Sequence, residues 1–139
     1  MQEIRLTYEV PGDDFTRAGE ASADLKTRLK KLGIAPEAIR KTAIALYEGE
    51  INLAIHAGGG HIVVLVSPTV IDMKIQDEGP GIADISLAMK EGWSTAPDEV
   101  RSLGFGAGMG LPNMKKYSDE FDIQSAVGVG TKVHMKVHV

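Results

Sequence analysis

Two apolar segments joined by three residues constrain the fold of this chain more than any other feature. "HIVVLV" (61–66) and "VIDMKIQ" (70–76) are rich in β-branched residues, which is typical of buried strands. The linker Ser67–Pro68–Thr69 is a tight turn. Neighbouring strands joined by such a turn indicate an antiparallel or mixed sheet, and its apolar face needs a covering layer.

Other patterned segments lie on both sides of this strand pair. They predict a strand at 4–10, helices at about 15–32 and 36–56, a short helix at 85–91, a helix at about 111–118, and strands at 121–125 and 131–139. This order predicts an α+β fold, a two-layer α/β sandwich with helices on one face of a mixed, mostly antiparallel sheet. The length suits a single domain over 1–139.

Composition excludes several classes of protein. The chain has no cysteine, so disulfides, thiolate metal sites and thiol nucleophiles are excluded. A net charge of −4 without a dense basic run argues against direct binding to nucleic acid. No apolar run approaches the roughly 20 residues of a membrane span, and the N-terminus has the pattern of a strand and not of a signal peptide. We therefore expect a cytoplasmic protein.

Two polar residues fall on the inward face of the predicted sheet. The period of two places Asp77 on the same side as Ile75, and it places Thr131 on the apolar side of the last strand. A buried carboxylate needs a partner. The partner of Asp77 is either a neighbouring backbone amide or an amino group of a ligand between sheet and helices. Gly79 and Gly81 would allow close backbone approach there.

The helix at 36–56 carries a polar stripe. Glu48, Asn52 and His56 follow one another at intervals of four residues, as on any half-exposed helix or at a site. Glu50 falls instead within the apolar stripe, where the pattern offers no reason for it beyond a helix-end position or a role in a site.

A glycine-rich segment precedes the helix at 111–118. In "GFGAGMG" (104–110), every second residue is glycine, which suits either a flexible loop or a backbone cradle for phosphate oxygens. The segment lacks the Gly-Lys-Ser/Thr of a P-loop, and it does not fit a dinucleotide-binding fingerprint. Residues 92–110 as a whole are predicted to form a mobile segment.

The order and spacing of these features are similar to the N, G1 and G2 boxes of the Bergerat-fold (GHKL) ATPase superfamily. The matching motifs are Glu48-x-x-x-Asn52, "DEGPGI" (77–82), "GFGAGMGLPNMKK" (104–116) and Gly130–Thr131. The resemblance covers nearly the whole chain. The small size and the sequence from 108 to 133 look most like stand-alone anti-sigma-factor serine/threonine kinases, or a histidine-kinase-like ATPase domain.

The resemblance implies a site for ATP and Mg²⁺. Asp77 would accept a hydrogen bond from the adenine amino group, supported by Thr131, and Asn52 would bind Mg²⁺. Glu48 would be the general base. The other residues expected to contact nucleotide, partly as a lid, are Gly79, Gly81, Gly104, Gly106, Gly108, Met109, Gly110 and Leu111.

The implied function is that of an ATP-binding regulatory protein, which transfers the γ-phosphate of ATP to a small protein partner of the anti-sigma antagonist or sigma-factor type. Two alternatives are a catalytically quiet, nucleotide-gated binding module and a detached histidine-kinase catalytic domain. The resemblance is also compatible with a homodimer. The phosphoacceptor residue and the roles of Glu50 and Arg101 stay open at this point.

Overall fold

The computed structural model describes residues 3–12, 19–56, 58–79, 89 and 110–139. The elements in chain order are β1 (Ile4–Pro11), α1 (Glu20–Lys31), α2 (Pro36–His56), β2 (Gly59–Val66), β3 (Val70–Gln76), α5 (Gly110–Lys116), β4 (Glu120–Ala126) and β5 (Gly130–His138). All of 92–109, and all but Met89 of the short helix expected at 85–91, lie outside the described residues.

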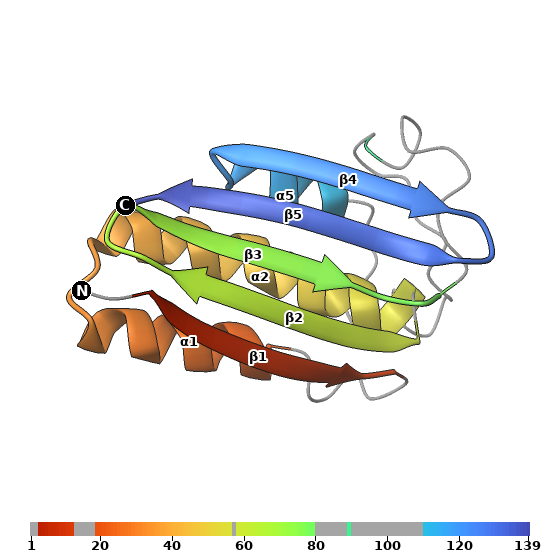
Figure 1. The fold of residues 1–139 in the computed structure, drawn as a ribbon, viewed down its shortest axis with the longest axis horizontal. Helices are drawn as coiled ribbons and strands as arrows, with labels where there is room; N and C mark the ends of the chain where they lie inside the picture. The colour runs from red at the N-terminus through yellow and green to blue at the C-terminus, as the bar shows by residue number, and fades with distance from the viewer. Residues whose placement is uncertain (1–2, 13–18, 57, 80–88, 90–109) are drawn as a thin grey trace.

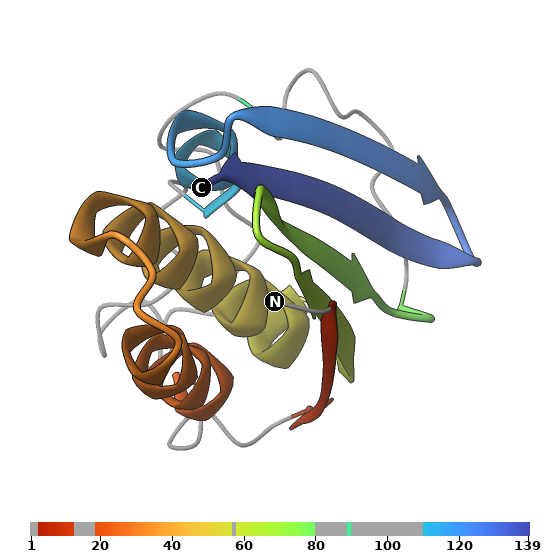
Figure 2. The same cartoon turned by 60° about the vertical axis from the view of Figure 1, so that its left-hand side comes forward.

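The five described strands form one sheet in the order β1-β2-β3-β5-β4 (Figure 1). All four pairings are antiparallel, so the described sheet has no parallel pair. Figure 2 shows α1, α2 and α5 together on one face of this sheet, which confirms the predicted two-layer α+β sandwich. None of the described helices is both long and apolar enough to cross a membrane.

The core lies between the sheet and the helices. Inward-facing side chains alternate along each interior strand, as the period of two requires. Fully buried examples are Ile62, Val64, Val66, Ile71, Met73, Met135 and Val137 from the strands, and Leu25, Leu29 and Leu46 from the helices. Each such side chain contributes about 1.5–3 kcal/mol by leaving water, so this layer supplies much of the stability of the fold.

The first helix begins directly after a glycine. α1 starts at Glu20, because Gly19 has a left-handed backbone with φ of 103°, and residues 15–18 of the helix expected from about Phe15 lie outside the described residues. A right-handed helix cannot continue through that conformation. The predicted end is confirmed: Gly33, with φ of 76°, follows the C-cap Leu32.

Candidate functional site

Three segments that are distant in sequence meet at one end of the sheet. In Figure 1, α2 and β3 end, and β5 begins, towards the same side of the view. A Cβ built on Gly60 would lie 2.8 Å from Leu53 Cδ2 on α2 and 3.3 Å from Asp77 Cβ, so the Leu53 and Asp77 side chains both pack against Gly60. The structure therefore brings the end of α2, which carries Glu48 and Asn52, towards Asp77 and Thr131.

Asp77 lies just after β3 and is 8% exposed. Its Oδ1 atom accepts hydrogen bonds from the backbone N–H groups of Gly79 at 2.8 Å and Thr131 at 3.2 Å. Its own N–H donates to Thr131 O at 3.0 Å. Within the described residues, Oδ2 accepts no hydrogen bond. Within the part of the chain that the structure describes, backbone N–H groups therefore satisfy Oδ1 of this carboxylate.

Glycine permits the close contact between β5 and Asp77. Gly130 has a φ of 137°, and a Cβ there would lie 2.2 Å from Asp77 O. Thr131, directly after it, is buried, and its Oγ1 lies 2.8 Å from Ser125 Oγ. The sequence does not predict Gly60 as a site residue, although it lies in a run of three glycines, 58–60.

Glu48 and Asn52 lie one turn apart on α2, and both are half-buried. Glu48 Oε1 accepts a hydrogen bond from Asn113 Nδ2 on α5 at 3.3 Å. Burial raises the pKa of Glu48, and the hydrogen bond from Asn113 opposes that shift in smaller measure. A carboxylate whose pKa is raised towards neutral pH suits a general base.

The sequence does not predict the contact between Asn113 and Glu48. It lies inside the quoted "GLPNMKK" motif, but its partner Glu48 is 65 positions earlier. No local pattern links residues so far apart.

The remaining predicted site residues divide into two groups. Leu111 is buried in α5, and Gly110 is the first residue of that helix. The others lie outside the described residues: Gly81, Arg101, Gly104, Gly106, Gly108 and Met109.

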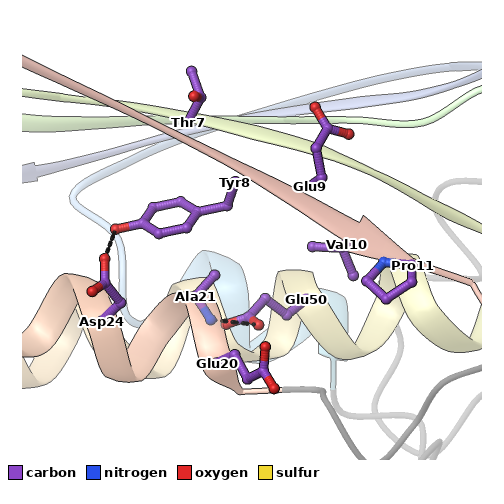
Figure 3. A pocket seen from close by; sticks show the side chains of 9 residues that line it. All are labelled: Thr7, Tyr8, Glu9, Val10, Pro11, Glu20, Ala21, Asp24 and Glu50. Atoms are coloured by element: carbon purple, nitrogen blue, oxygen red, sulfur yellow. Dashed lines mark hydrogen bonds between the residues drawn. The ribbon is translucent and has the colours of Figure 1, made fainter.

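Glu50 has a clear structural partner. Its side chain is 2% exposed, and its carboxylate accepts hydrogen bonds from the backbone N–H groups of Gly19 at 3.0 Å, Ala21 at 3.1 Å and Ser22 at 2.6 Å. These amides belong to the N-terminus of α1, where a helix has unpaired donors and a positive dipole end. Glu50 therefore caps α1 from the neighbouring helix (Figure 3).

A cavity of about 340 Å³ lies between β1 and α1, next to Glu50 (Figure 3). The residues that line it include the acidic residues Glu9, Glu20, Asp24 and Glu50, although the Glu9 side chain points away from α1 (Figure 3). Tyr8 O–H donates to Asp24 Oδ2 at 2.7 Å, and the pKa of Tyr8 is raised, first by burial and then by this carboxylate. None of the predicted nucleotide-binding residues lines it, and its acidic lining does not suit a triphosphate.

Comparison with protein families and curated proteins gives a consistent result. Residues 33–139 match the model of the histidine kinase-, DNA gyrase B- and HSP90-like ATPase family. The serine/threonine-protein kinase RsbT of Bacillus subtilis is 33% identical over 108 residues, which cover 75% of each chain. An anti-sigma F factor of Caldanaerobacter subterraneus is 30% identical over 146 aligned positions, which cover 100% of this chain and 94% of that protein.

Comparison with solved structures supports the fold alone. The RsbU and RsbW domains of a Mycobacterium tuberculosis protein match with a TM-score of 0.60 and 15% identity, over 99% of this chain and 32% of that one. The mycobacterial sensor histidine kinase MprB matches with a TM-score of 0.55 and 17% identity, over 97% of both chains.

Proposed function

Because this chain belongs to the histidine kinase-, DNA gyrase B- and HSP90-like ATPase family, we propose that it is an ATP-dependent protein serine/threonine kinase that regulates a small partner protein. The observation that carries the proposal is the half-buried Glu48, whose pKa is raised, one helical turn from Asn52 and at the end of the sheet that holds Asp77. Relatives named as a serine/threonine kinase and as anti-sigma factors support it.

The adenine base is held at Asp77. Oδ1 accepts hydrogen bonds from the backbone amides of Gly79 and Thr131, and in this proposal Oδ2 accepts a hydrogen bond from the adenine amino group. Thr131 supports this contact from the start of β5. Gly81 and the glycine-rich segment 104–110, with Met109 and Leu111, complete the nucleotide site in this proposal, and the backbone amides near the start of α5 bind phosphate oxygens.

Asn52 binds Mg²⁺ through its side-chain oxygen. Mg²⁺ prefers oxygen ligands and keeps several waters, so one protein ligand together with the phosphates of ATP is a suitable set. The bound ion would neutralise charge on the phosphates during transfer.

Glu48 removes the proton from the acceptor hydroxyl. The hydroxyl oxygen of a serine or threonine on the partner then attacks the γ-phosphorus of ATP, and ADP leaves with the electrons of the broken P–O bond. Because this reaction uses ATP and a protein acceptor, the proposal places the protein in the cytoplasm. A homodimer stays a prediction.

A transfer assay tests the proposal. The purified protein is incubated with γ-labelled ATP, Mg²⁺ and lysate of the host, beside Glu48→Gln and the control Glu37→Gln. Glu37 lies exposed at the start of the same helix, paired with Arg40. We expect a labelled protein band that is stable in acid and lost in alkali, present with wild type and Glu37→Gln and absent with Glu48→Gln.

Other outcomes point to other functions. An acid-labile band would indicate transfer to histidine, and free phosphate without a band would indicate an ATPase. No label anywhere would indicate a nucleotide-gated binding module and would contradict the proposed kinase.

A further inference from the structure

We propose that Asn113 is a positioning residue that holds the Glu48 carboxylate in its working orientation, an inference that rests on the proposed function. The contact links α2 to α5: Asn113 Nδ2 donates to Glu48 Oε1 at 3.3 Å. This distance is at the long end for an amide donor, as catalytic hydrogen bonds often are before substrate binds.

The helix that carries Asn113 is firmly seated on α2. Met114, the next residue, is fully buried, and Leu111 is buried one turn earlier. A Cβ built on Gly49 would lie 3.7 Å from Met114 Sδ and 2.3 Å from Ile75 Cδ1. The glycine directly after Glu48 therefore makes room for both β3 and α5 against this part of α2.

Side chains beyond the core hold the other end of α5 in place. The Tyr117 ring lies 5.7 Å from the Arg40 guanidinium carbon of α2 and 5.4 Å from Lys116 Nζ. Lys41 Nζ of α2 forms an ion pair of 2.5 Å with Asp119, just after α5. The side-chain amide of Asn113 is thus presented to Glu48 from a helix that α2 itself fixes.

The chemistry of an amide suits this role. The Asn113 NH₂ group donates and cannot take up the proton that Glu48 removes. By occupying Oε1, it leaves Oε2 for the acceptor hydroxyl and restricts the rotation of the carboxylate. Asn113 also lies three residues after Gly110, the first residue of α5. The helix that begins at the proposed phosphate site is therefore also the helix that positions Glu48, the general base.

The decisive experiment compares Asn113→Ala and Asn113→Asp in the transfer assay, with the phosphoacceptor protein captured there as substrate. The control is Lys115→Ala, an exposed position on the same helix. We expect kcat to fall about tenfold in Asn113→Ala, the effect of losing one hydrogen bond to a charged group. It should fall further in Asn113→Asp, because the new carboxylate repels Glu48, while the Kd for ATP stays the same in both.

A larger fall in kcat for Asn113→Asp than for Asn113→Ala distinguishes a positioning role of Asn113 from a packing role. Asp has nearly the shape of Asn, so a residue needed only for packing would tolerate Asp better than Ala. If Asn113→Asp is as active as Asn113→Ala or more active, or if ATP affinity falls together with kcat, the positioning role is wrong. Unchanged kcat in both variants would also overturn it.

A second measurement, in the nucleotide-free protein, distinguishes failure of the positioning role of Asn113 from failure of the proposed kinase function. The chain has two asparagines, so the side-chain amide signals of Asn113 are readily assigned by NMR. They should move in Glu48→Gln and stay in place in Glu37→Gln. If wild type transfers no phosphate, the proposed function fails and the positioning role with it. A moved signal would then show that the contact itself exists.

Discussion

Glu48 and Glu50 lie two positions apart on α2, and two positions turn the side-chain direction of a helix by about 200°. Glu48 meets Asn113 on α5, whereas Glu50 meets the first amides of α1. Both carboxylates belong to one short sequence, "YEGEIN", but the structure gives them different partners on different helices. A substitution at one position therefore tests a function that the other does not share.

Glu50→Gln should destabilise the fold. The amide group of glutamine would place N–H donors against the N–H groups of α1, and the loss of the buried acceptor should lower the free energy of unfolding by about 3 kcal/mol. Urea denaturation measures this. Glu48→Gln is the same chemical change on a different face of α2, and it should not lower the free energy of unfolding. Equal losses in the two variants would contradict the capping role of Glu50.

Asp77→Asn should abolish binding of adenine nucleotide and leave the fold intact. The asparagine oxygen can replace Oδ1 as acceptor for Gly79 and Thr131, so its NH₂ group would take the place of Oδ2 and oppose the adenine amino group. Loss of one hydrogen bond with donor–donor repulsion should weaken affinity about 100-fold or more.

Calorimetry with ADP measures this affinity, and circular dichroism checks the fold. The matched control is Asp72→Asn on the outward face of β3, where Asp72 pairs with His134. If Asp77→Asn binds ADP as the wild type does, the assignment of the adenine site is wrong.

At the scale of elements, the hairpin of β4 and β5 shapes the site, because it brings the start of β5 against Asp77. The strands themselves could be predicted, since each alternates apolar and polar residues. Their order could not, because β5 lies between β3 and β4 through pairings such as Ile75 with Val133 that no local pattern specifies. The capping of α1 by Glu50 could not be predicted for a related reason: Glu50 comes 28 positions after Ser22 in the sequence.

Two glycines of this hairpin give a matched pair for mutation. Gly130→Ala introduces a Cβ at 2.2 Å from Asp77 O at a φ of 137°, whereas Gly128→Ala meets nothing within 4 Å at a φ of 79°. Gly128→Ala should cost about 1–2 kcal/mol for its left-handed backbone alone. Gly130→Ala should cost about 2 kcal/mol more, from the added steric clash, and should weaken nucleotide binding.

Thermal unfolding and calorimetry on the two variants check this prediction. Similar losses of stability at both positions would show that β5 can shift away from Asp77 without penalty.

At the scale of the whole molecule, the described fold includes more than the matched family region. The family model begins at residue 33, yet β1 pairs with β2 along its length, and α1 packs on α2 with Glu50 as its cap. The motifs on α2 and β3 could be predicted from the sequence, because a resemblance connects them. The Glu48–Asn113 contact spans 65 positions, and only the tertiary fold shows it.

The half-buried Glu48 at the candidate site should make stability depend on pH. Burial raises the pKa of Glu48 above its ordinary value of 4.5, so the folded protein holds this proton more tightly than the unfolded chain does. Ionisation of Glu48 therefore costs stability as pH rises above that value. Glu48→Gln should have a higher Tm than wild type at pH 7, with the difference vanishing below about pH 4.5.

Scanning calorimetry of both proteins between about pH 3.5 and 8 measures this difference. A variant that is less stable than wild type at pH 7, with a gap that grows as pH rises, would show that the ionised Glu48 stabilises the fold.

The pairing of β1 with β2 also implies a delay during synthesis between the appearance of β1 and the completion of its partner strand. Ile4 faces Val66 across the strands, so β1 leaves the ribosome about sixty residues before its partner strand is complete. At roughly 5–20 residues per second, that interval lasts about 3–12 s. During it β1 has no strand beside it, and α1 lacks its glutamate cap until residue 50 has emerged. A nascent chain of this protein therefore exposes β1 and the start of α1 for seconds. In that interval a chaperone would bind β1, or β1 would pair with another copy of the chain.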